Sequence, residues 1–296
     1  TRGGLWDLRS GQRVFYTRGF NAAVVWPEGI VDADFTKFQE QKRQIARMDA
    51  TRHRIDDEQE IGDQEVRQFG TVLLRTARKG KGEWKRRDLT VEALDVGSSK
   101  TLWTREFPKE APQFLSSRSE GNLVLSWPAN SEGAKLEIKN DSGLSQRWAR
   151  LDAGPGDYFL EVVQPSTGKI LGSTVVRTSK RAFALASAES SGDWLVAADS
   201  RNRLLVFSLE SGEERGILFG QQPVISTAAS LLAVENERGQ LLLYDLATLT
   251  RKEQYLFTSP IAYTYFAADN RRLFVLTGNQ TAYFLALPAG ESAKTP

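Results

Sequence analysis

Two consecutive segments of the chain carry the same order of hydrophobic and polar positions. The first is DWLVAADSRNRLLVFSLESGEER at 193–215, and the second is SLLAVENERGQLLLYDLATLTRK at 230–252. In each segment an apolar run is followed by a polar turn, a second apolar run, a small polar turn and the start of a third strand. This order predicts a β-meander that is repeated along the chain.

The same hairpin pattern recurs over most of the sequence. Its phase can be marked by Trp6 in LWDLRSGQ, and the residues that match it in the other units are Met48, Leu94, Val163, Phe207, Tyr244 and Leu285. The steps between them are 42, 46, 69, 44, 37 and 41 residues. Five of these six steps lie near the spacing of about 40 to 45 residues that is typical of a four-stranded propeller blade. The pattern therefore predicts an all-β fold, a β-propeller of about seven four-stranded blades, with eight as the other possibility.

Two further features of the repeat support this prediction. Glycine stands at one turn position in four of the units, as Gly11, Gly168, Gly212 and Gly290, where a hairpin of this length favours a residue in the left-handed region. The strands expected at 194–198, 231–234 and 273–276 are almost continuously apolar. Such strands are expected to be packed on both faces, between neighbouring blades.

Two segments interrupt the period. Residues 36–68 are rich in charge and are interpreted as a charged insertion. The step from Leu94 to Val163 is too long for one blade, and residues 133–156 are interpreted as an inserted segment, with an additional degenerate blade as the alternative. The whole of 1–296 is expected to form a single propeller domain.

The two ends of the sequence fall at different phases of the repeat. The N-terminal strands GGLWDL and RVFYTRGF correspond to the third and fourth strands of a blade, whereas the last unit stops after three strands, near Leu287. Because an open edge strand favours aggregation, a propeller is expected to close its ring. We therefore expect an incomplete opening blade whose first two strands come from an upstream part of a longer protein, with 1–296 as its C-terminal part. A shortened closing blade is the alternative.

The segments LWDLRSGQ, VFSLESGE and LYDLAT resemble the repeats of WD-repeat propellers, whose units end in an aromatic-Asp pair. Trp6-Asp7 and Tyr244-Asp245 keep this pair, but the Gly-His dipeptide of such repeats is missing, and with it the expected histidine hydrogen-bond network. A more general bacterial-type propeller is also compatible with the residues. The resemblance implies a platform for protein interactions and only rarely an enzyme.

The composition limits the chemistry that the chain could perform. It has 39 Lys and Arg against 37 Asp and Glu, a net charge of +2, one histidine and no cysteine. Disulfides, thiolate metal sites and cysteine nucleophiles are therefore ruled out. His53 has no identifiable triad partner and is interpreted as an exposed turn residue. We predict no catalytic residues, no metal and no cofactor. With no apolar run of about 18 residues, no membrane span is expected, and a soluble protein of either the cytoplasm or the periplasm is compatible with the sequence.

One stretch concentrates charge and carries the only candidate binding residues. Six acidic residues lie in 56–65 and seven basic residues in 75–87. They could be solvated, mutually compensating loop faces. The alternative is an interaction patch for a partner, made of Arg75, Arg78, Lys79, Lys81, Trp84, Lys85, Arg86 and Arg87.

Three functions are compatible with this sequence. The favoured one is a non-enzymatic scaffold that binds a protein partner or the missing upstream part of its own chain. The second is an enzyme or small-ligand binder with a site in the central channel. The third is a nucleic-acid binder that uses residues 75–87, where Trp84 could stack on a base. The near-neutral net charge makes the third the least favoured.

Overall fold

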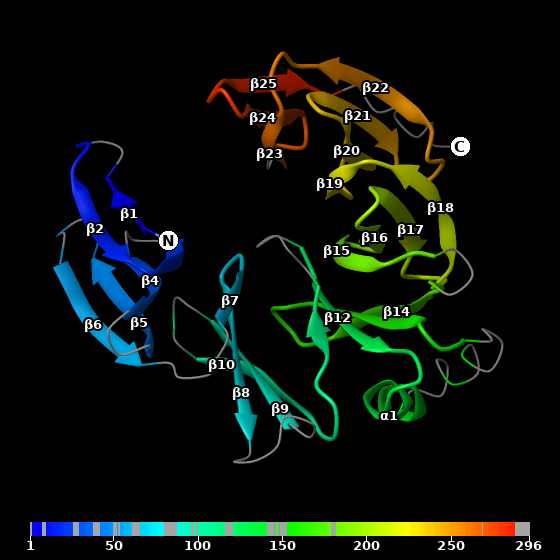
Figure 1. The fold of residues 1–296 in the computed structure, drawn as a ribbon, viewed down its shortest axis with the longest axis horizontal. Helices are drawn as coiled ribbons and strands as arrows, with labels where there is room; N and C mark the ends of the chain where they lie inside the picture. Colours follow the sequence, from blue (N-terminus) through cyan, green and yellow to red (C-terminus); the bar gives the residue numbers. More distant parts are fainter. Residues whose placement is uncertain are drawn as a thin grey trace. The chain divides into compact units, whose positions relative to one another are not determined.

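The computed structural model of the chain describes residues 2–7, 10–25, 30–37, 42–49, 52, 54–60, 66–79, 88–95, 98, 100–115, 121–140, 145, 148, 153–178, 182–267 and 269–287. The chain divides into two compact units, one of residues 1–111 with 165–168 and one of residues 112–164 with 169–296. Within the described residues the strands form seven antiparallel sheets, shown in chain order by the colours of Figure 1.

The first unit contains three of these sheets. Their strands are β1 (Arg2–Trp6) and β2 (Arg13–Arg18); β3 (Phe20–Val25), β4 (Ile30–Lys37), β5 (Lys42–Asp49) and β6 (Arg54–Glu60); and β7 (Val66–Phe69), β8 (Val72–Lys79), β9 (Asp88–Asp95) and β10 (Thr101–Phe107).

The second unit contains the other four sheets. Their strands are β11 (Gln113–Phe114), β12 (Leu123–Pro128), β13 (Tyr158–Val163) and β14 (Ile170–Val176); β15 (Leu185–Ser191), β16 (Trp194–Asp199), β17 (Arg203–Ser208) and β18 (Glu214–Phe219); β19 (Gln221–Ser226), β20 (Leu231–Glu237), β21 (Gln240–Asp245) and β22 (Arg251–Leu256); and β23 (Ile261–Phe266), β24 (Arg272–Thr277) and β25 (Ala282–Ala286). Every sheet is a meander in which each strand pairs with the next one in the chain. The predicted all-β chain of successive four-stranded meanders is confirmed.

The predicted phase of the repeat also agrees with the strands. In each of the six sheets of three or four strands, the marker residue lies at or near the end of the third strand: Met48 in β5, Leu94 in β9, Val163 in β13, Phe207 in β17, Tyr244 in β21 and Leu285 in β25. Trp6 ends β1, which pairs with β2 in a two-stranded sheet. The first hairpin forms a two-stranded sheet and β23–β25 form a three-stranded one. That β1 and β2 are the third and fourth strands of a blade stays a prediction.

A register shift recurs at the marker and is not apparent from the sequence. In each hairpin between a third and a fourth strand, the pairing skips one residue of the fourth strand beside the marker. The skipped residues are Val14, Asp56, Leu102, Leu171, Arg215 and Lys252. A β-bulge of this kind increases the local twist of a strand. Its recurrence means that the fourth strand is twisted at the same place in each sheet.

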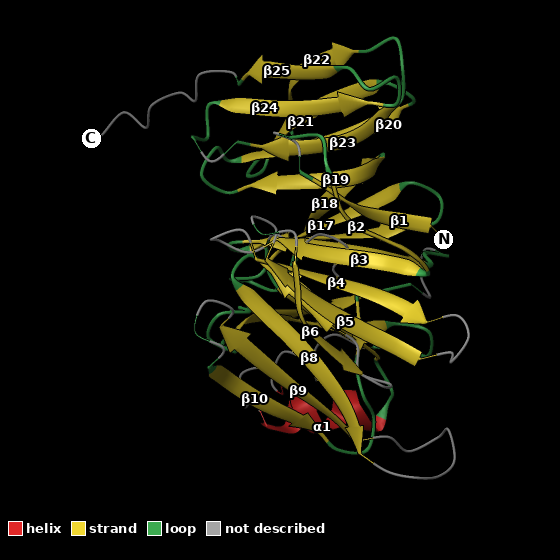
Figure 2. Cartoon of the chain, turned by 90° about the vertical axis from the view of Figure 1, so that its left-hand side faces the viewer, coloured by secondary structure: helices red, strands yellow, loops and turns green. Residues whose placement is uncertain are grey.

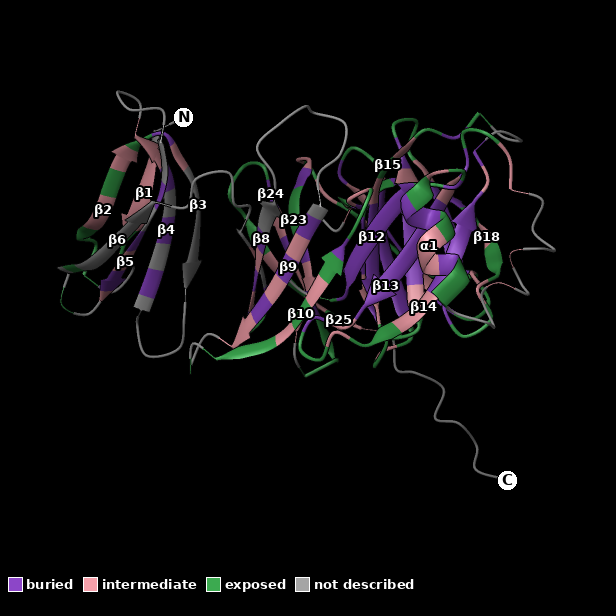
Figure 3. Ribbon diagram, turned by 90° about the horizontal axis from the view of Figure 1, so that it is seen from below, coloured by how far each residue is buried: buried purple, intermediate pink, exposed green. Residues whose placement is uncertain are grey.

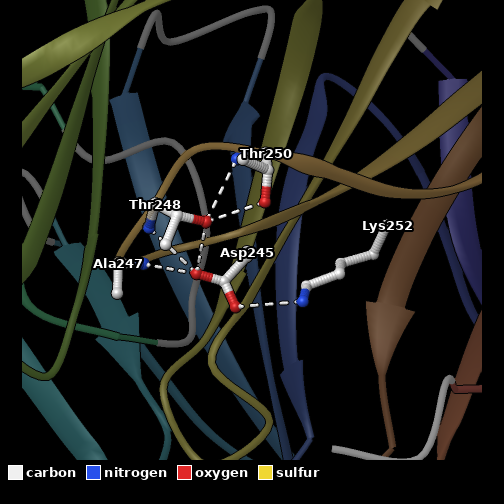
Figure 4. A network of polar contacts seen from close by, with 5 residues as sticks. All are labelled: Asp245, Ala247, Thr248, Thr250 and Lys252. Atoms are coloured by element: carbon white, nitrogen blue, oxygen red, sulfur yellow. Dashed lines mark hydrogen bonds and ion pairs between the residues drawn. The ribbon is translucent and has the colours of Figure 1, made fainter.

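The turn before the bulge is also repeated in four of the six hairpins. Gly11, Gly168 and Gly212 have φ values of +69°, +71° and +69°, as predicted, and Leu249 takes the same conformation at +54°. Gly290 lies outside the described residues. In the last of these turns Asp245 accepts hydrogen bonds from the backbone N–H groups of Ala247 and Thr248 (Figure 4). The aspartate of the aromatic-Asp pair therefore closes its own turn.

The hydrophobic core lies between successive sheets of the same unit. In the three four-stranded sheets of the second unit, the second and third strands are the most buried, as Figure 3 shows in purple for β12 and β13. One cluster joins the sheet β11–β14 to β15–β18, a second joins β15–β18 to β19–β22, and a third joins β19–β22 to β23–β25. In the first unit, Leu5 and Phe15 pack against Val31, Ala33 and Met48. Strands buried on both faces explain the continuous apolar runs of the sequence.

The two segments that interrupt the period have regular structure. Within 36–68 lie the end of β4, β5, β6 and the start of β7, so much of this charged segment belongs to sheets. The connection from β12 to β13 spans 129–157 and contains helix α1 (Glu132–Asn140), drawn in red in Figure 2. Residues 136–140, which could also have formed a strand, are helical.

Candidate functional site

The predicted basic patch is described only in part. Arg75, Arg78 and Lys79 lie on β8. The Arg75 guanidinium contacts the carboxylate of Glu92 on the neighbouring strand β9, with Nη2 and Nε 2.5 and 3.2 Å from Oε2. Hydrogen bonds from Arg75 and then Thr101 lower the pKa of Glu92.

The structure does not describe the other five residues of the predicted patch, which are Lys81, Trp84, Lys85, Arg86 and Arg87. His53 also lies outside the described residues. The patch stays a prediction, and the charge of Arg75 is already balanced by Glu92.

Two other features of the second unit are candidates for function. The first is a hollow of about 410 Å³ beside the first strands of three successive sheets. Its lining residues come from β15, the end of β16 and the turn after it, the β18–β19 linker, β19 and β23. They are Ser187, Glu189, Ala198, Asp199, Asn202, Gly220, Gln221, Gln222, Pro223 and Tyr263. Most of these side chains are polar, and none is a lysine or an arginine.

Asp199 forms a fixed part of this lining. Its carboxylate accepts hydrogen bonds from the backbone N–H groups of Arg201 and Arg203, at 2.9 and 2.8 Å, and pairs with the Arg203 guanidinium at 2.6 Å. Burial alone would raise the pKa of Asp199, but these bonds together hold it below its usual value. The side chain is therefore a buried carboxylate that stays charged and holds the β16–β17 turn.

Glu235 holds together the two strands β19 and β23, which line the hollow. It is buried on β20, where Oε1 accepts hydrogen bonds from the backbone N–H groups of Gly239 and Ile261, at 3.0 and 3.2 Å. Its Oε2 accepts one from Nε2 of the lining residue Gln221, at 3.2 Å. One carboxylate thus ties β19 to the start of β23, the two strands that carry Gln222 and Tyr263.

The second feature is an uncovered aromatic pair on the sheet β23–β25. Phe274 and Phe284 are paired across β24 and β25, with ring centroids 5.2 Å apart. The pairs at the same position of the three preceding sheets are Val124–Val162, Val196–Val206 and Ala233–Leu243. All six of those residues are 0% exposed, whereas Phe284 is 67% exposed. We call Phe274 and Phe284 the aromatic face.

The partners of the equivalent pairs show which way the aromatic face points. Val124 and Val162 share a cluster with Leu195 of the next sheet, Val196 and Val206 with Leu232, and Ala233 and Leu243 with Val275. In each case the pair is covered by the sheet that follows in the chain. The aromatic face therefore occupies the position against which a further sheet packs.

Sequence reasoning missed both features, although each has a signal there. Glu189 interrupts a strand that otherwise alternates small residues, and Gln221-Gln222-Pro223 follows the one-residue linker Gly220. Phe284 stands at a repeat position that holds Val162, Val206 and Leu243 in the three preceding sheets, and it is larger than any of these. These signals become specific only when the strands are in register.

Other kinds of site are not found in the part of the chain that the structure describes. No group of three or more histidine, aspartate or glutamate side chains that could hold a metal ion occurs there. In the same residues no helix has the length and apolar character needed to cross a membrane.

The chain has no match among protein-family models or curated protein sequences. Among solved structures it is similar to the computationally designed protein Ika8, with a TM-score of 0.50 at 12% identity, covering 95% of this chain and 76% of that one. Two others are Hsv2 of Kluyvelomyces marxianus (TM-score 0.49, 10% identity, coverage 94% and 75%) and a chain of the mitotic checkpoint complex (0.45, 11%, 88% and 77%). At such low identity the similarity to Ika8 concerns the fold alone.

Proposed function

We propose that this protein is a non-enzymatic scaffold, a β-propeller of about seven four-stranded blades that binds protein through the aromatic face of its last sheet. The bound element is a further β-sheet, which belongs either to a partner or to another part of its own polypeptide. The observation that carries the proposal is Phe284, which is 67% exposed at a position where the three preceding sheets bury their side chains completely.

The energetics favour covering this face. A phenylalanine side chain contributes about 1.5–3 kcal/mol when it moves from water into an apolar contact. Large exposed apolar patches commonly mark interaction surfaces. Within the described residues no strand pairs with the outer edge of β25, which therefore offers backbone hydrogen-bonding groups beside the exposed ring. Apolar contact and strand addition would act together at one place.

The proposal includes the arrangement of the sheets as blades of a propeller. Six hairpins share the same bulge and phase, and four of them share the same left-handed turn residue, which supports a single repeated blade. The clusters between successive sheets support the stacking of blades within the second unit. The resemblance to WD repeats at Trp6-Asp7 and Tyr244-Asp245 is compatible with an interaction platform.

The proposal is tested by placing a photo-crosslinking phenylalanine analogue at position 284 of the full-length protein, in extract of its native cells. Cross-links are expected to map to one recurring β-strand segment, of this chain or of one partner, and to be lost when Phe274→Glu is added. The matched control carries the analogue at Glu253, an exposed position of strand β22. Equal, unspecific labelling from positions 284 and 253 would argue against the proposal.

The hollow supports a second candidate, a small-ligand binder. It collects polar side chains from three successive sheets, which is the kind of convergence that ligand sites show. The nucleic-acid alternative has less support, because Arg75 is paired with Glu92.

A further inference from the structure

We propose that the hollow beside β15, β19 and β23 is a binding site for an organic cation, an ammonium or guanidinium group. This site adjoins the aromatic face where Tyr263 contacts Phe274, but Phe274 and Phe284 are not among its lining residues. Its ligand is recognised by charge, hydrogen bonding and an aromatic ring. The size fits, since about 410 Å³ lies at the lower end of the range of about 300–1,000 Å³ found for ligand pockets.

The lining is rich in groups that attract a cation. It contains two carboxylates, Glu189 and Asp199, and the amide oxygens of Asn202, Gln221 and Gln222 add further acceptors. Among the described lining residues there is no lysine or arginine, but the Arg203 guanidinium pairs with Asp199 from outside the lining. Glu189 and Asp199 against Arg203 leave a formal charge of −1 (−2 + 1), which favours a positively charged ligand over an anion.

Tyr263 adds an aromatic surface to the same hollow. The side chain is 45% exposed and lines the hollow, and its ring lies 6.5 Å from Phe274. A cation within about 6 Å of such a ring gains roughly 0.5–1 kcal/mol at an exposed site. Carboxylate, amide oxygens and an aromatic ring together are suited to an ammonium or guanidinium group.

The backbone of β19 is irregular where it lines the hollow. The pairing with β20 passes from Gln221–Glu235 directly to Val224–Ala233, so Gln222 and Pro223 leave the ladder in a bulge. Gln222 has a φ of +51°, a left-handed conformation that is unfavourable for a residue with a Cβ atom. Strained residues of this kind cluster at binding sites, where the surrounding structure holds them.

The bulge is held in place by its neighbours. Before it, Gly220 admits no side chain, because a Cβ atom there would lie 2.2 Å from Cγ1 of Val234. In addition, Glu235 accepts hydrogen bonds from the Gln221 side chain and from the backbone N–H of Ile261, and these bonds connect β19 with β23. The site is therefore formed before any ligand binds, which lowers the entropic cost of binding.

The test is a titration of the full-length protein, by calorimetry or NMR, with agmatine and with the acetylated tripeptide amides Gly-Arg-Gly and Gly-citrulline-Gly. Citrulline has the shape of arginine without its charge. We expect agmatine and the arginine peptide to bind saturably and the citrulline peptide to bind at least about tenfold more weakly. Binding should weaken between about 50 and about 300 mM salt. The ratio of the affinities for agmatine and the arginine peptide tells a free ligand from a side chain of a partner.

The variants separate the role of each group. Glu189→Gln should weaken binding of the cation, and Tyr263→Ala should weaken it about two- to fivefold while Tyr263→Phe, which keeps the ring, changes it less than about twofold. Because Glu189 is buried and its variant could disturb folding, the exposed Tyr263 pair decides the question independently. Glu253→Gln, on an exposed strand, is the matched charge control and should bind normally.

Three results would overturn the proposal: equal affinity for the arginine and citrulline peptides, no saturable binding of either cation, or unchanged binding in Tyr263→Ala. Saturable binding of an uncharged oligosaccharide in place of the cations would likewise assign the hollow to another ligand class. Phe284→Ser changes neither the lining nor its charge and should leave cation binding unchanged, so failure of this proposal and failure of the scaffold function can be told apart.

Discussion

Asp245 illustrates how a single side chain organises a turn that is used throughout the chain. Its Oδ1 accepts from the backbone N–H of Ala247 at 3.1 Å and of Thr248 at 2.9 Å, and from the Thr248 hydroxyl at 3.0 Å. Asp49 and Asp95 accept from the backbone N–H three residues later in the same way. The aspartate that suggested WD repeats thus has a local reason to occur: it fixes the turn before the bulged strand.

Replacing Asp245 should have an effect that depends on pH. The N–H of Thr248 is the main reason that the pKa of Asp245 is lowered from 3.8, with further lowering by the Thr248 hydroxyl and Lys252 and an opposing effect of burial. A carboxylate with a lowered folded-state pKa stabilises the protein above its unfolded-state pKa, and this contribution is lost as the pH falls through the folded value. Asp245→Ala should therefore cost about 1–2 kcal/mol in urea unfolding at about pH 7, and the difference from wild type should shrink below about pH 4.

Lys252→Ala is the control for this measurement. Its Nζ lies 3.9 Å from Oδ2 of Asp245 and both side chains contact solvent, so the change should be below about 0.5 kcal/mol. An equal cost for both variants would mean that the ion pair, and not the turn, carries the stability.

At the scale of strands and helices, the sequence predicts the repeat well where the apolar runs are continuous and poorly where they are not. The charged insertion expected at 36–68 contains strand β5, in which Gln44, Ala46 and Met48 are buried in alternation. A glutamine and an alanine contribute little to a hydrophobic pattern, and the apolar Ile45 stands between them, so the sequence shows no clear period of two residues. Strand pairing with β4 and β6 determines the structure of this segment.

Helix α1 offers a test at the same scale. Its first turn is capped by Ser131, whose Oγ accepts a hydrogen bond from the N–H of Ala134 at 3.1 Å. Ser131→Ala removes this acceptor and should destabilise the helix by about 1 kcal/mol. Because α1 lies in the connection between β12 and β13, we expect this to appear as roughly fivefold faster amide hydrogen exchange in residues 132–140, with little change in β12 and β13.

Ser131→Asp supplies the comparison for the helix. Aspartate is an equally good cap and its charge is favourable at a helix N-terminus, so exchange in α1 should stay near the wild-type rate. If Ser131→Asp exchanged as fast as Ser131→Ala, the hydrogen bond to Ala134 would not be what stabilises the helix.

At the scale of the whole molecule, the features proposed for function depend on relations between sheets. The hollow combines Glu189, Gln222 and Tyr263 from three first strands, 74 residues apart at the extremes (263 − 189). The aromatic face is recognised only by comparing Phe284 with residues of three other sheets. A single sequence predicts the period of the strands, but the positions that face one another follow from register and from the bulges, which no residue type specifies.

The stacking of sheets in the second unit predicts which sheets lose stability when a core side chain is truncated. Each cluster joins only two successive sheets, so stability should be coupled mainly between nearest neighbours. Leu195 belongs to the cluster between β11–β14 and β15–β18, and Leu243 belongs to the one between β19–β22 and β23–β25. Both side chains are completely buried, and truncation to alanine should cost about 2–5 kcal/mol in each case.

Hydrogen exchange measured sheet by sheet distinguishes the two variants. Leu195→Ala should accelerate exchange most in β12–β18, and Leu243→Ala should accelerate it most in β20–β25, because each cavity removes contacts from the two sheets that share the cluster. The variants are matched in residue type and burial, so each serves as the control for the other. If both accelerated exchange to the same extent in all four sheets, the second unit would unfold as one cooperative block, and its clusters would not be separate units of stability.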